Sequence, residues 1–230
     1  EGANVGMLDA DIYGPSQPRM LGVSGKPESV DGKSLEPMNS YHLQAMSIGF
    51  LVDADQPMIW RGPMVTSALQ QLLHQTNWRD LDYLIIDMPP GTGDIQLTLS
   101  QQVPVSGAVI VTTPQNIATL DARKGLAMFK KVNVPVVGII ENMSWFTGDD
   151  GKRYAIFGQG GGAALAEYLK TDLLVQIPLE PTVRDGADRG LPAVAVDPEG
   201  EAAAAFNLLA QEVENRTPTV RTHPELIVDN

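Results

Sequence analysis

Short apolar runs alternate with longer amphipathic runs along most of the chain. Runs such as "YLIID" (83–87) and "VIVTT" (109–113) lack polar alternation, which is typical of strands buried on both faces of a parallel sheet. The pattern predicts strands over 4–9, 41–50, 82–89, 107–114, 135–143 and 171–178, and helices over 63–76, 94–102, 116–131, 160–169, 181–189 and 199–215. This order indicates an α/β fold, a doubly wound and mostly parallel sheet flanked by helices.

The remaining segments suggest how the chain is organised. Residues 22–40 are rich in Gly, Ser and Pro and predict a long surface loop. The chain has 230 residues, a length that favours one large domain. We therefore expect a single domain over 1–216 and a C-terminal tail over 217–230.

Composition narrows the classes of function. Apolar residues make up 43% of the chain, enough for a sizeable core. The net charge of −12 argues against a general electrostatic hold on nucleic acid or an anionic membrane. The chain has no cysteine, so it cannot supply disulfides, a catalytic thiolate or thiolate ligands for a metal cluster. These features fit a cytoplasmic protein.

Three predicted strands end in unusual polar residues. The first ends in Asp9 and Asp11, the second in Asp87 before a Pro-Pro-Gly-Thr-Gly turn, and the third in Glu141 and Asn142. Ligands of open parallel sheets bind beyond the carboxyl ends of the strands. An apolar strand that ends in Asp is typical of a Walker B site, where the carboxylate holds Mg²⁺ directly or through water. A lone strand-end Asp can equally form a turn or cap a helix.

Several longer stretches of the chain are similar to the motifs of a known protein family. They are "LDADIYGPSQPRMLG" (8–22), "PMIWRGPM" (57–64), "YLIIDMPPGTGD" (83–94), "VTTPQNIATLDARKGLAMFKKVNVPVVGIIENMS" (111–144) and "IFGQGGG" (156–162). From residue 1 to about residue 215 the chain resembles the Mrp/ApbC family of iron–sulfur cluster carrier P-loop ATPases, which are relatives of MinD and ParA. The resemblance implies a P-loop NTPase-like fold of the MinD/ParA type and a homodimer that works with iron–sulfur assembly proteins and client apoproteins.

The resemblance also implies roles in binding ATP and Mg²⁺. Asp11 would orient the attacking water, Asp9 would support Mg²⁺ through its hydration shell, and Asp87 would be the Walker B acid, holding Mg²⁺ through water. The switch II turn would comprise Gly91, Thr92, Gly93 and Asp94. Asn142 and the loop at Pro178 would recognise adenine.

The chain departs from the family at two places. No G-x-x-x-x-G-K-[ST] motif occurs in it, so we expect a chain that is truncated at its N-terminus relative to the family and has little or no ATPase activity as given. Where many members carry Cys-x-x-Cys, this chain has "TGDDGKRYA" (147–155), in which Asp149-Asp150-Gly151 predicts a hairpin turn. The iron–sulfur cluster is thus implied by the resemblance but has no cysteine ligands here.

Some alternatives stay open. A MinD/ParA-like positioning ATPase is the second candidate, although the net charge and the acidic last helix do not favour membrane or DNA binding. A third is a scaffold that no longer turns over ATP. The "GQGGGA" stretch (158–163) resembles a dinucleotide fingerprint, but it follows no long buried strand and predicts a simple helix entry.

Overall fold

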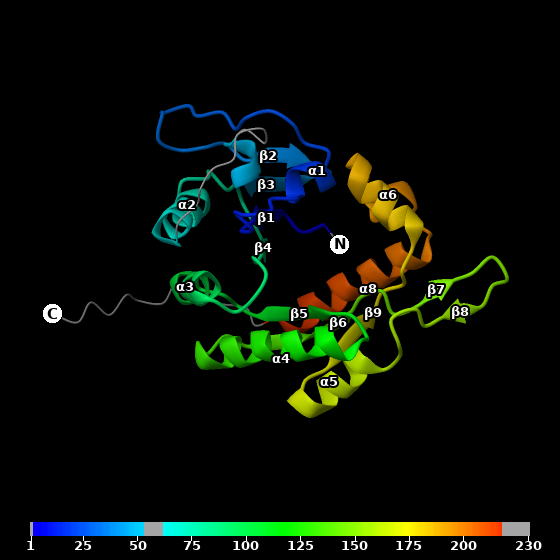
Figure 1. The fold of residues 1–230 in the computed structure, drawn as a ribbon. Helices are drawn as coiled ribbons and strands as arrows, with labels where there is room; N and C mark the ends of the chain where they lie inside the picture. Colours follow the sequence, from blue (N-terminus) through cyan, green and yellow to red (C-terminus); the bar gives the residue numbers. More distant parts are fainter. Residues whose placement is uncertain (1, 53–61, 218–230) are drawn as a thin grey trace. The chain divides into compact units, whose positions relative to one another are not determined.

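The structure is a computed structural model that describes residues 2–52 and 62–217. Two compact units share these residues: unit 1 comprises Glu1–Pro90 and Pro181–Pro198, and unit 2 comprises Gly91–Glu180 and Glu199–Asn230. Figure 1 shows their elements in sequence colours. The single domain expected over 1–216 stays a prediction. The "PMIWR" part of the second motif and nearly all of the predicted tail lie outside the described residues.

Unit 1 contains a four-stranded sheet in the order β2-β3-β1-β4. Strands β1 (Val5–Asp9), β3 (Leu43–Ser47) and β4 (Tyr83–Asp87) are parallel, and the short β2 (Met38–Ser40) is antiparallel to β3. Its helices are α1 (Gln17–Met20), α2 (Gly62–His74), α6 (Pro181–Arg189) and α7 (Ala193–Val196). Helix α2 buries Val65, Leu69 and Leu72, a spacing that places them on one helical face.

The strand predicted over 41–50 is wrong at both ends. Tyr41 and His42 form the turn between β2 and β3, with positive φ of 49° and 63°, and Ile48–Phe50 form a 3₁₀ helix, η1. The Ser47 hydroxyl accepts a hydrogen bond from the backbone N–H of Gly49 at 3.0 Å. This capping contact turns the chain out of the strand direction.

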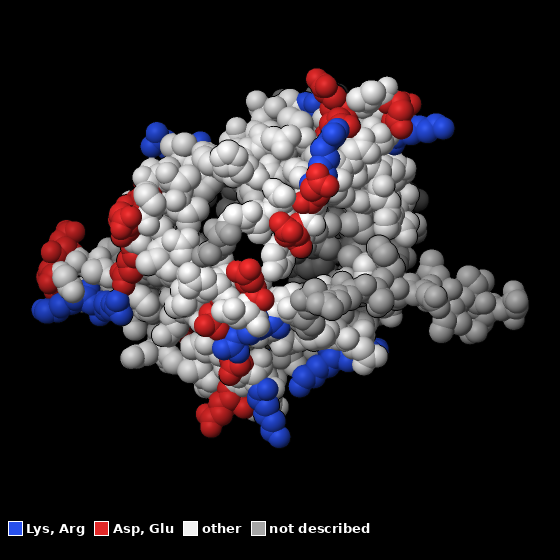
Figure 2. Space-filling model, turned by 180° about the vertical axis from the view of Figure 1, so that it is seen from behind, with Lys and Arg blue, Asp and Glu red and all other residues white. Residues whose placement is uncertain are grey.

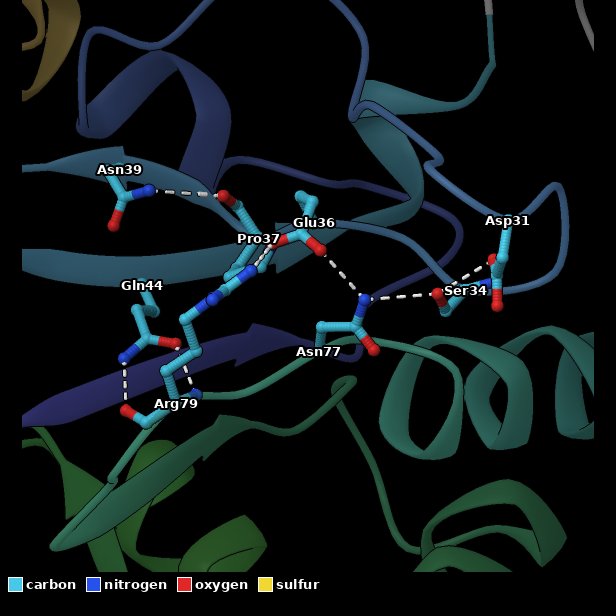
Figure 3. A network of polar contacts seen from close by, with 8 residues as sticks. All are labelled: Asp31, Ser34, Glu36, Pro37, Asn39, Gln44, Asn77 and Arg79. Atoms are coloured by element: carbon cyan, nitrogen blue, oxygen red, sulfur yellow. Dashed lines mark hydrogen bonds and ion pairs between the residues drawn. The ribbon is translucent and has the colours of Figure 1, made fainter.

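The segment 22–40 is a loop as predicted, except that its last three residues form β2. A polar network ties this loop to the rest of unit 1 (Figure 3). Asn77 donates to Ser34 at 3.0 Å and to Glu36 at 2.8 Å, and Arg79 pairs with Glu36 at 2.5 Å. The loop is therefore fixed by side chains that follow α2 rather than by a core of its own.

The carboxylate of Asp31 organises the tip of the same loop. It accepts hydrogen bonds from the backbone N–H groups of Lys33 and Ser34 and from the Ser34 hydroxyl. These donors favour the charged form and lower the pKa of Asp31 to about 2.

Helix α6 packs against α1 through two glycines. Gly22 and Gly190 both have positive φ, of 63° and 69°. A Cβ atom on Gly190 would lie 2.2 Å from the Cα atom of Gly22. The contact leaves no space for a side chain, and it helps to explain why residues 181–198, far along the chain, belong to unit 1.

Unit 2 contains a parallel sheet in the order β5-β6-β9, formed by β5 (Ala108–Thr112), β6 (Val136–Glu141) and β9 (Leu173–Gln176). Its helices are α3 (Asp94–Gln102), α4 (Asn116–Lys131), α5 (Gly161–Leu169) and α8 (Glu201–Arg216). Figure 1 shows α4 and α5 on one side of this sheet and α8 on the other.

Each face of this sheet has its own hydrophobic core. Ile110 and Ile139 pack with residues of α4 and α5, whereas the next residue on β6, Ile140, packs with Phe206 and Leu209 of α8. Successive strand residues point to opposite faces. This arrangement confirms the predicted fold class of a mostly parallel sheet flanked by helices. Burial on both faces is not complete for the two apolar runs, because the run at 83–87 forms β4 of unit 1, where Ile85 is 43% exposed, and Val111 of β5 is 59% exposed.

Two local predictions for unit 2 are also confirmed. Strands β7 (Phe146–Thr147) and β8 (Arg153–Tyr154) form a hairpin whose turn contains Gly151 at a φ of 73°. The "GQGGGA" stretch leads into α5, with Gly160 in the left-handed conformation just before the helix. A Cβ atom on Gly161 would lie 1.9 Å from the carbonyl oxygen of Pro114, so the helix begins in direct contact with the segment that follows β5.

On the face drawn in Figure 2, charged side chains lie in several places, some with acidic and basic residues together and some with one kind alone. Several of the basic groups are ion-paired, as in Arg153 with Glu201 at 2.5 Å and Arg19 with Asp188 at 3.5 Å. Within the described part of the chain, no helix combines the length and the apolar character that crossing a bilayer requires.

Candidate functional site

Three strands of unit 1 end at the same level with polar residues. In the register of the parallel sheet, Asp9 lies opposite Ser47 of β3 on one side and opposite Asp87 of β4 on the other. Parallel strands bring their carboxyl ends to one edge of the sheet. The sequence prediction that Asp9 and Asp87 form part of one site is consistent with this placement.

Asp9 is completely buried, with 0% of its surface exposed. Its carboxylate accepts hydrogen bonds from the Ser47 hydroxyl at 3.0 Å and from the backbone N–H groups of Gln17 and Asp11 at 3.2 Å each. Burial raises the pKa of Asp9, the three hydrogen bonds oppose this rise, and the negative charge of Asp87 adds a smaller upward contribution. A cation near this carboxylate would favour its charged form.

Asp87 is half-buried, and hydrogen bonds hold both its backbone and its side chain in place. Its backbone carbonyl accepts from the N–H of Ala10 at 2.9 Å. Its side-chain Oδ2 accepts from the Nε2 amide of Gln17 at 2.7 Å. Gln17 thus contacts both strand-end acids, Asp9 through its backbone and Asp87 through its side chain.

Asp11 shapes the turn that follows β1. Its Oδ1 atom accepts from the backbone N–H groups of Tyr13 and Gly14, each at 3.2 Å. This is the turn-forming role that the sequence left open for a strand-end Asp. Its second oxygen, Oδ2, accepts no hydrogen bond from another described residue, and the water-orienting role stays a prediction.

In unit 2, the two segments predicted to recognise adenine lie side by side. The loop after β6 begins at Asn142, whose N–H donates to the Thr112 carbonyl at 2.7 Å. The N–H of Ser144 donates to the Ile177 carbonyl at 2.9 Å, and the N–H of Leu179 donates to the Trp145 carbonyl at 2.7 Å. Backbone hydrogen bonds therefore join the loop after Asn142 to the segment around Pro178, and Pro178 itself is buried.

Glu141 lies beneath this loop with 1% of its surface exposed. Its carboxylate accepts from the N–H of Gly162 at 2.5 Å, from the Ser144 hydroxyl at 2.9 Å and from the Gln176 amide at 2.7 Å. These donors come from the start of α5, from the loop after β6 and from β9. One buried carboxylate thus fixes three segments of unit 2 around Asn142.

The Gly91-Thr92-Gly93 turn is exposed and leads into α3 at Asp94, where the sequence predicted a helix start. Gly91 has a φ of 97°, a conformation that favours glycine. The side chain of Asp94 lies outside the described part. The role of Gly91, Thr92, Gly93 and Asp94 as a phosphate-sensing switch stays a prediction.

The donor atoms decide which metal groups the chain can hold. Among the described residues, no three His, Cys, Asp or Glu side chains are placed to hold a metal ion by themselves. Mg²⁺ is usually bound by one or two carboxylates, with water and phosphate oxygens completing its shell, and Asp9 and Asp87 fit that supporting role. An iron–sulfur cluster needs thiolates, and this chain has no cysteine, so its own residues do not fit a cluster.

Sequence reasoning missed Gln17 and Ser47. Gln17 begins the short helix α1, eight residues after Asp9, and no spacing rule predicts its contact with Asp87. Ser47 could have been found, because it ends an apolar strand run just as Asp9 and Asp87 do, and parallel strands align such ends.

A mostly parallel sheet between helices, with acidic side chains at the carboxyl ends of adjacent strands, is the architecture of nucleotide-binding α/β proteins. Residues 1–214 match the family described as "ParA: NUBPL iron-transfer P-loop NTPase", and the chain belongs to this family. ATPase activity is characteristic of P-loop NTPases as a class.

Curated relatives agree with this assignment. The chain is 55% identical over 215 residues to the iron-sulfur cluster carrier protein of Salmonella typhimurium, an alignment that covers 93% of this chain and 58% of the relative. It is 47% identical over 222 residues to the iron-sulfur cluster transfer protein NUBPL of Mus musculus, covering 96% and 69% of the two chains. The chain thus spans little more than half the length of several bacterial relatives that it matches.

Solved structures share the fold. A nucleotide-binding protein from Archaeoglobus fulgidus, in complex with ADP, aligns with a TM-score of 0.73 and 34% identity over 87% of this chain and 78% of that one. The cell division ATPase MinD of Pyrococcus furiosus aligns with a TM-score of 0.66 and 20% identity over 93% and 86%. This confirms the predicted likeness to the MinD/ParA fold.

Proposed function

We propose that this chain is part of a protein that binds and hydrolyses Mg-ATP and uses that cycle to carry or transfer iron–sulfur clusters. The observation that supports it most directly is the alignment of Asp9 and Asp87 at the carboxyl ends of adjacent parallel strands, with Asp11 in the following turn. The family match and the names of its relatives supply the link to iron–sulfur clusters.

In this proposal each acid has a separate task. Asp87 holds Mg²⁺ through water, and Asp9 supports it from its buried position beside Asp87. Asp11 orients the attacking water with the carboxylate oxygen that is not used in its turn. Bound Mg²⁺ would neutralise charge on the phosphates, and phosphoryl transfer depends mainly on such positioning and neutralisation.

The nucleotide base would bind at unit 2. Asn142 and the segment around Pro178 are joined by backbone hydrogen bonds, and Glu141 fixes the loop that carries Asn142. A rigid pair of loops suits selective recognition of a base, because little conformational entropy is lost on binding.

The cluster is the cargo of this proposed function rather than a resident group. Since the chain contains no cysteine, thiolate ligands would have to come from a partner protein or an apoprotein client. We propose further that the protein acts as a homodimer in the cytoplasm, together with iron–sulfur assembly proteins and client apoproteins.

The test compares two Asp→Asn variants of the protein as its gene encodes it. Asp11→Asn should lower kcat by about 10²-fold or more and leave ATP affinity nearly unchanged, because a water-orienting group acts mainly in the transition state. Asp87→Asn should instead weaken Mg²⁺-dependent ATP binding in a calorimetric titration. The exposed Asp80, at a φ of 47° that Asn also tolerates, gives the matched control Asp80→Asn.

Turnover by Asp11→Asn at the rate of the parent would refute the role assigned to Asp11. Absence of Mg²⁺-dependent ATP binding by the parent protein would refute the proposed function as a whole. The 230-residue chain measured alongside should bind ATP weakly, because no G-x-x-x-x-G-K-[ST] motif occurs in its sequence.

A further inference from the structure

Gln17 is the single residue of the described chain that hydrogen-bonds both strand-end acids of unit 1. Its backbone N–H donates to Asp9 Oδ2 at 3.2 Å, and its side-chain Nε2 donates to Asp87 Oδ2 at 2.7 Å. Asp87 lies 70 residues from Gln17 in the sequence. A short hydrogen bond to a charged acceptor is among the stronger kinds that proteins form.

The backbone around Gln17 is held in place on both sides. A Cβ atom on Gly49 of η1 would lie 3.2 Å from the side chains of both Pro15 and Pro18, so these two prolines pack closely on η1. Pro18 also occupies the first turn of α1, where its fixed φ suits the helix and where a missing N–H costs nothing. Gln17 lies between the two prolines, and its amide is therefore presented to Asp87 from a fixed backbone.

The amide contact makes the two carboxylate oxygens of Asp87 different from each other. Oδ2 is bound by Gln17, whereas Oδ1 has no hydrogen bond to another residue in the part of the chain that the structure describes. A carboxylate fixed through one oxygen loses rotational freedom and keeps the other oxygen for an outside donor. Groups that orient a metal-binding carboxylate in this way usually strengthen metal binding.

We propose that Gln17 is a positioning residue for the divalent cation, which it serves by holding Asp87 through one oxygen and leaving the other to accept a hydrogen bond from water bound to Mg²⁺. The proposal rests on the proposed function, since it takes Asp87 as the acid that holds Mg²⁺. It adds Gln17, which is not one of the acids Asp9, Asp11 and Asp87, to the proposed cation site. Gln17 links two of these acids, Asp9 through its backbone N–H and Asp87 through its side chain.

A purely structural role for Gln17 would give different results. In that case the amide would only fasten the segment 10–16 to the sheet, and its loss would lower stability without changing cation affinity. Gln44 provides the matched comparison, because its side-chain amide also bridges two segments of unit 1, donating to the Arg79 carbonyl at 2.7 Å and accepting from the Arg79 N–H at 2.8 Å. It contacts neither acid.

The experiment titrates Mn²⁺ into the ¹⁵N-labelled 230-residue chain and follows paramagnetic broadening of amide signals by NMR. Mn²⁺ takes the oxygen ligands that Mg²⁺ takes. In the parent, we expect broadening at Asp9, Asp11 and Asp87 that added Mg²⁺ reverses. Gln17→Leu should raise the apparent Kd for Mn²⁺ about tenfold, at the lower end of the effect of orienting groups, and Gln44→Leu should leave it unchanged.

Gln17→Asn is the second variant, and it decides the question if Gln17→Leu does not fold. It keeps an amide and the backbone contact with Asp9 but is one methylene too short to reach Asp87, so the same tenfold loss is expected. Parent-like Mn²⁺ affinity in both folded variants would overturn the role of Gln17 and leave the proposed function standing. No broadening at Asp9, Asp11 and Asp87 in the parent would overturn the cation site and the role of Gln17 together.

Discussion

Removal of the buried carboxylate of Glu141 is the perturbation from which we expect the largest local effect on unit 2. In Glu141→Ala, the N–H of Gly162 and the amide of Gln176 lose their acceptor, whereas the Ser144 hydroxyl keeps its contact with the Glu141 carbonyl at 2.9 Å. The N–H of the buried Gly162 then stays unpaired, which costs about 1–3 kcal/mol. Gln176 is exposed, so its amide can pair with water instead. Part of this cost is offset, because a charge no longer has to be buried.

The expected net loss is about 2 kcal/mol in the free energy of unfolding of unit 2. Glu141→Gln should cost less, roughly 1 kcal/mol, because one amide oxygen can still accept from Gly162 while the charge-assisted part of the bonds is lost. Amide hydrogen exchange of β6, measured by NMR, reports on unit 2 separately from unit 1. The control is Glu167→Ala on the exposed face of α5, which should stay within about 0.5 kcal/mol of the parent.

An equal effect of Glu141→Ala and Glu167→Ala would refute the view that this carboxylate joins the three segments. A full effect on β6 that left the amide signals of Asn142 and Leu179 unchanged would refute its role in fixing the two loops.

Two further predictions concern the loop of unit 1 and the cargo. The lowered pKa of Asp31 means that its charged form stabilises the loop above the unfolded pKa of about 3.9, and that this contribution is lost as the pH falls towards about 2. The amide shifts of Lys33 and Ser34 should titrate near pH 2 and should do so at a higher pH in Ser34→Ala; a parent midpoint near 3.9 would contradict the network. Anaerobic treatment of the 230-residue chain with iron and sulfide should leave no stoichiometric cluster after desalting, since there are no thiolates, and a visible thiolate-type absorbance band on this chain would contradict that expectation.

The sequence alone predicted the order of the longer helices and strands, most of them to within one or two residues at each end. It did not predict the short elements α1, β2 and α7. The apolar runs at 83–87 and 109–113 predicted two strands of a parallel sheet, and they form β4 and β5. Their predicted burial on both faces is only partly right, because Ile85 of β4 and Val111 of β5 are exposed. The turn residues Asp149-Asp150-Gly151 marked the hairpin correctly. These features depend on side-chain periodicity and on local turn chemistry, which a sequence shows directly.

The acids at the strand ends were also visible in the sequence, because an Asp that closes an apolar strand stands out from its neighbours. The contacts that these acids make with their partners were not predicted from the sequence. Gln17 meets Asp87 across 70 residues, Ser47 meets Asp9 across 38, and Gln176 meets Glu141 across 35. Each of these contacts depends on strand order, on register or on where the chain begins a short helix, which are set by packing over the whole unit.

The sequence by itself therefore determined which residues could carry charge to the edge of the sheet. Only the tertiary structure decided how they are held: Asp9 fully buried among three donors, Asp11 engaged in a turn, and Asp87 bound through one oxygen by Gln17. The physical reason is that hydrogen bonding and burial are properties of an environment assembled from distant segments, whereas residue type and spacing are properties of the chain.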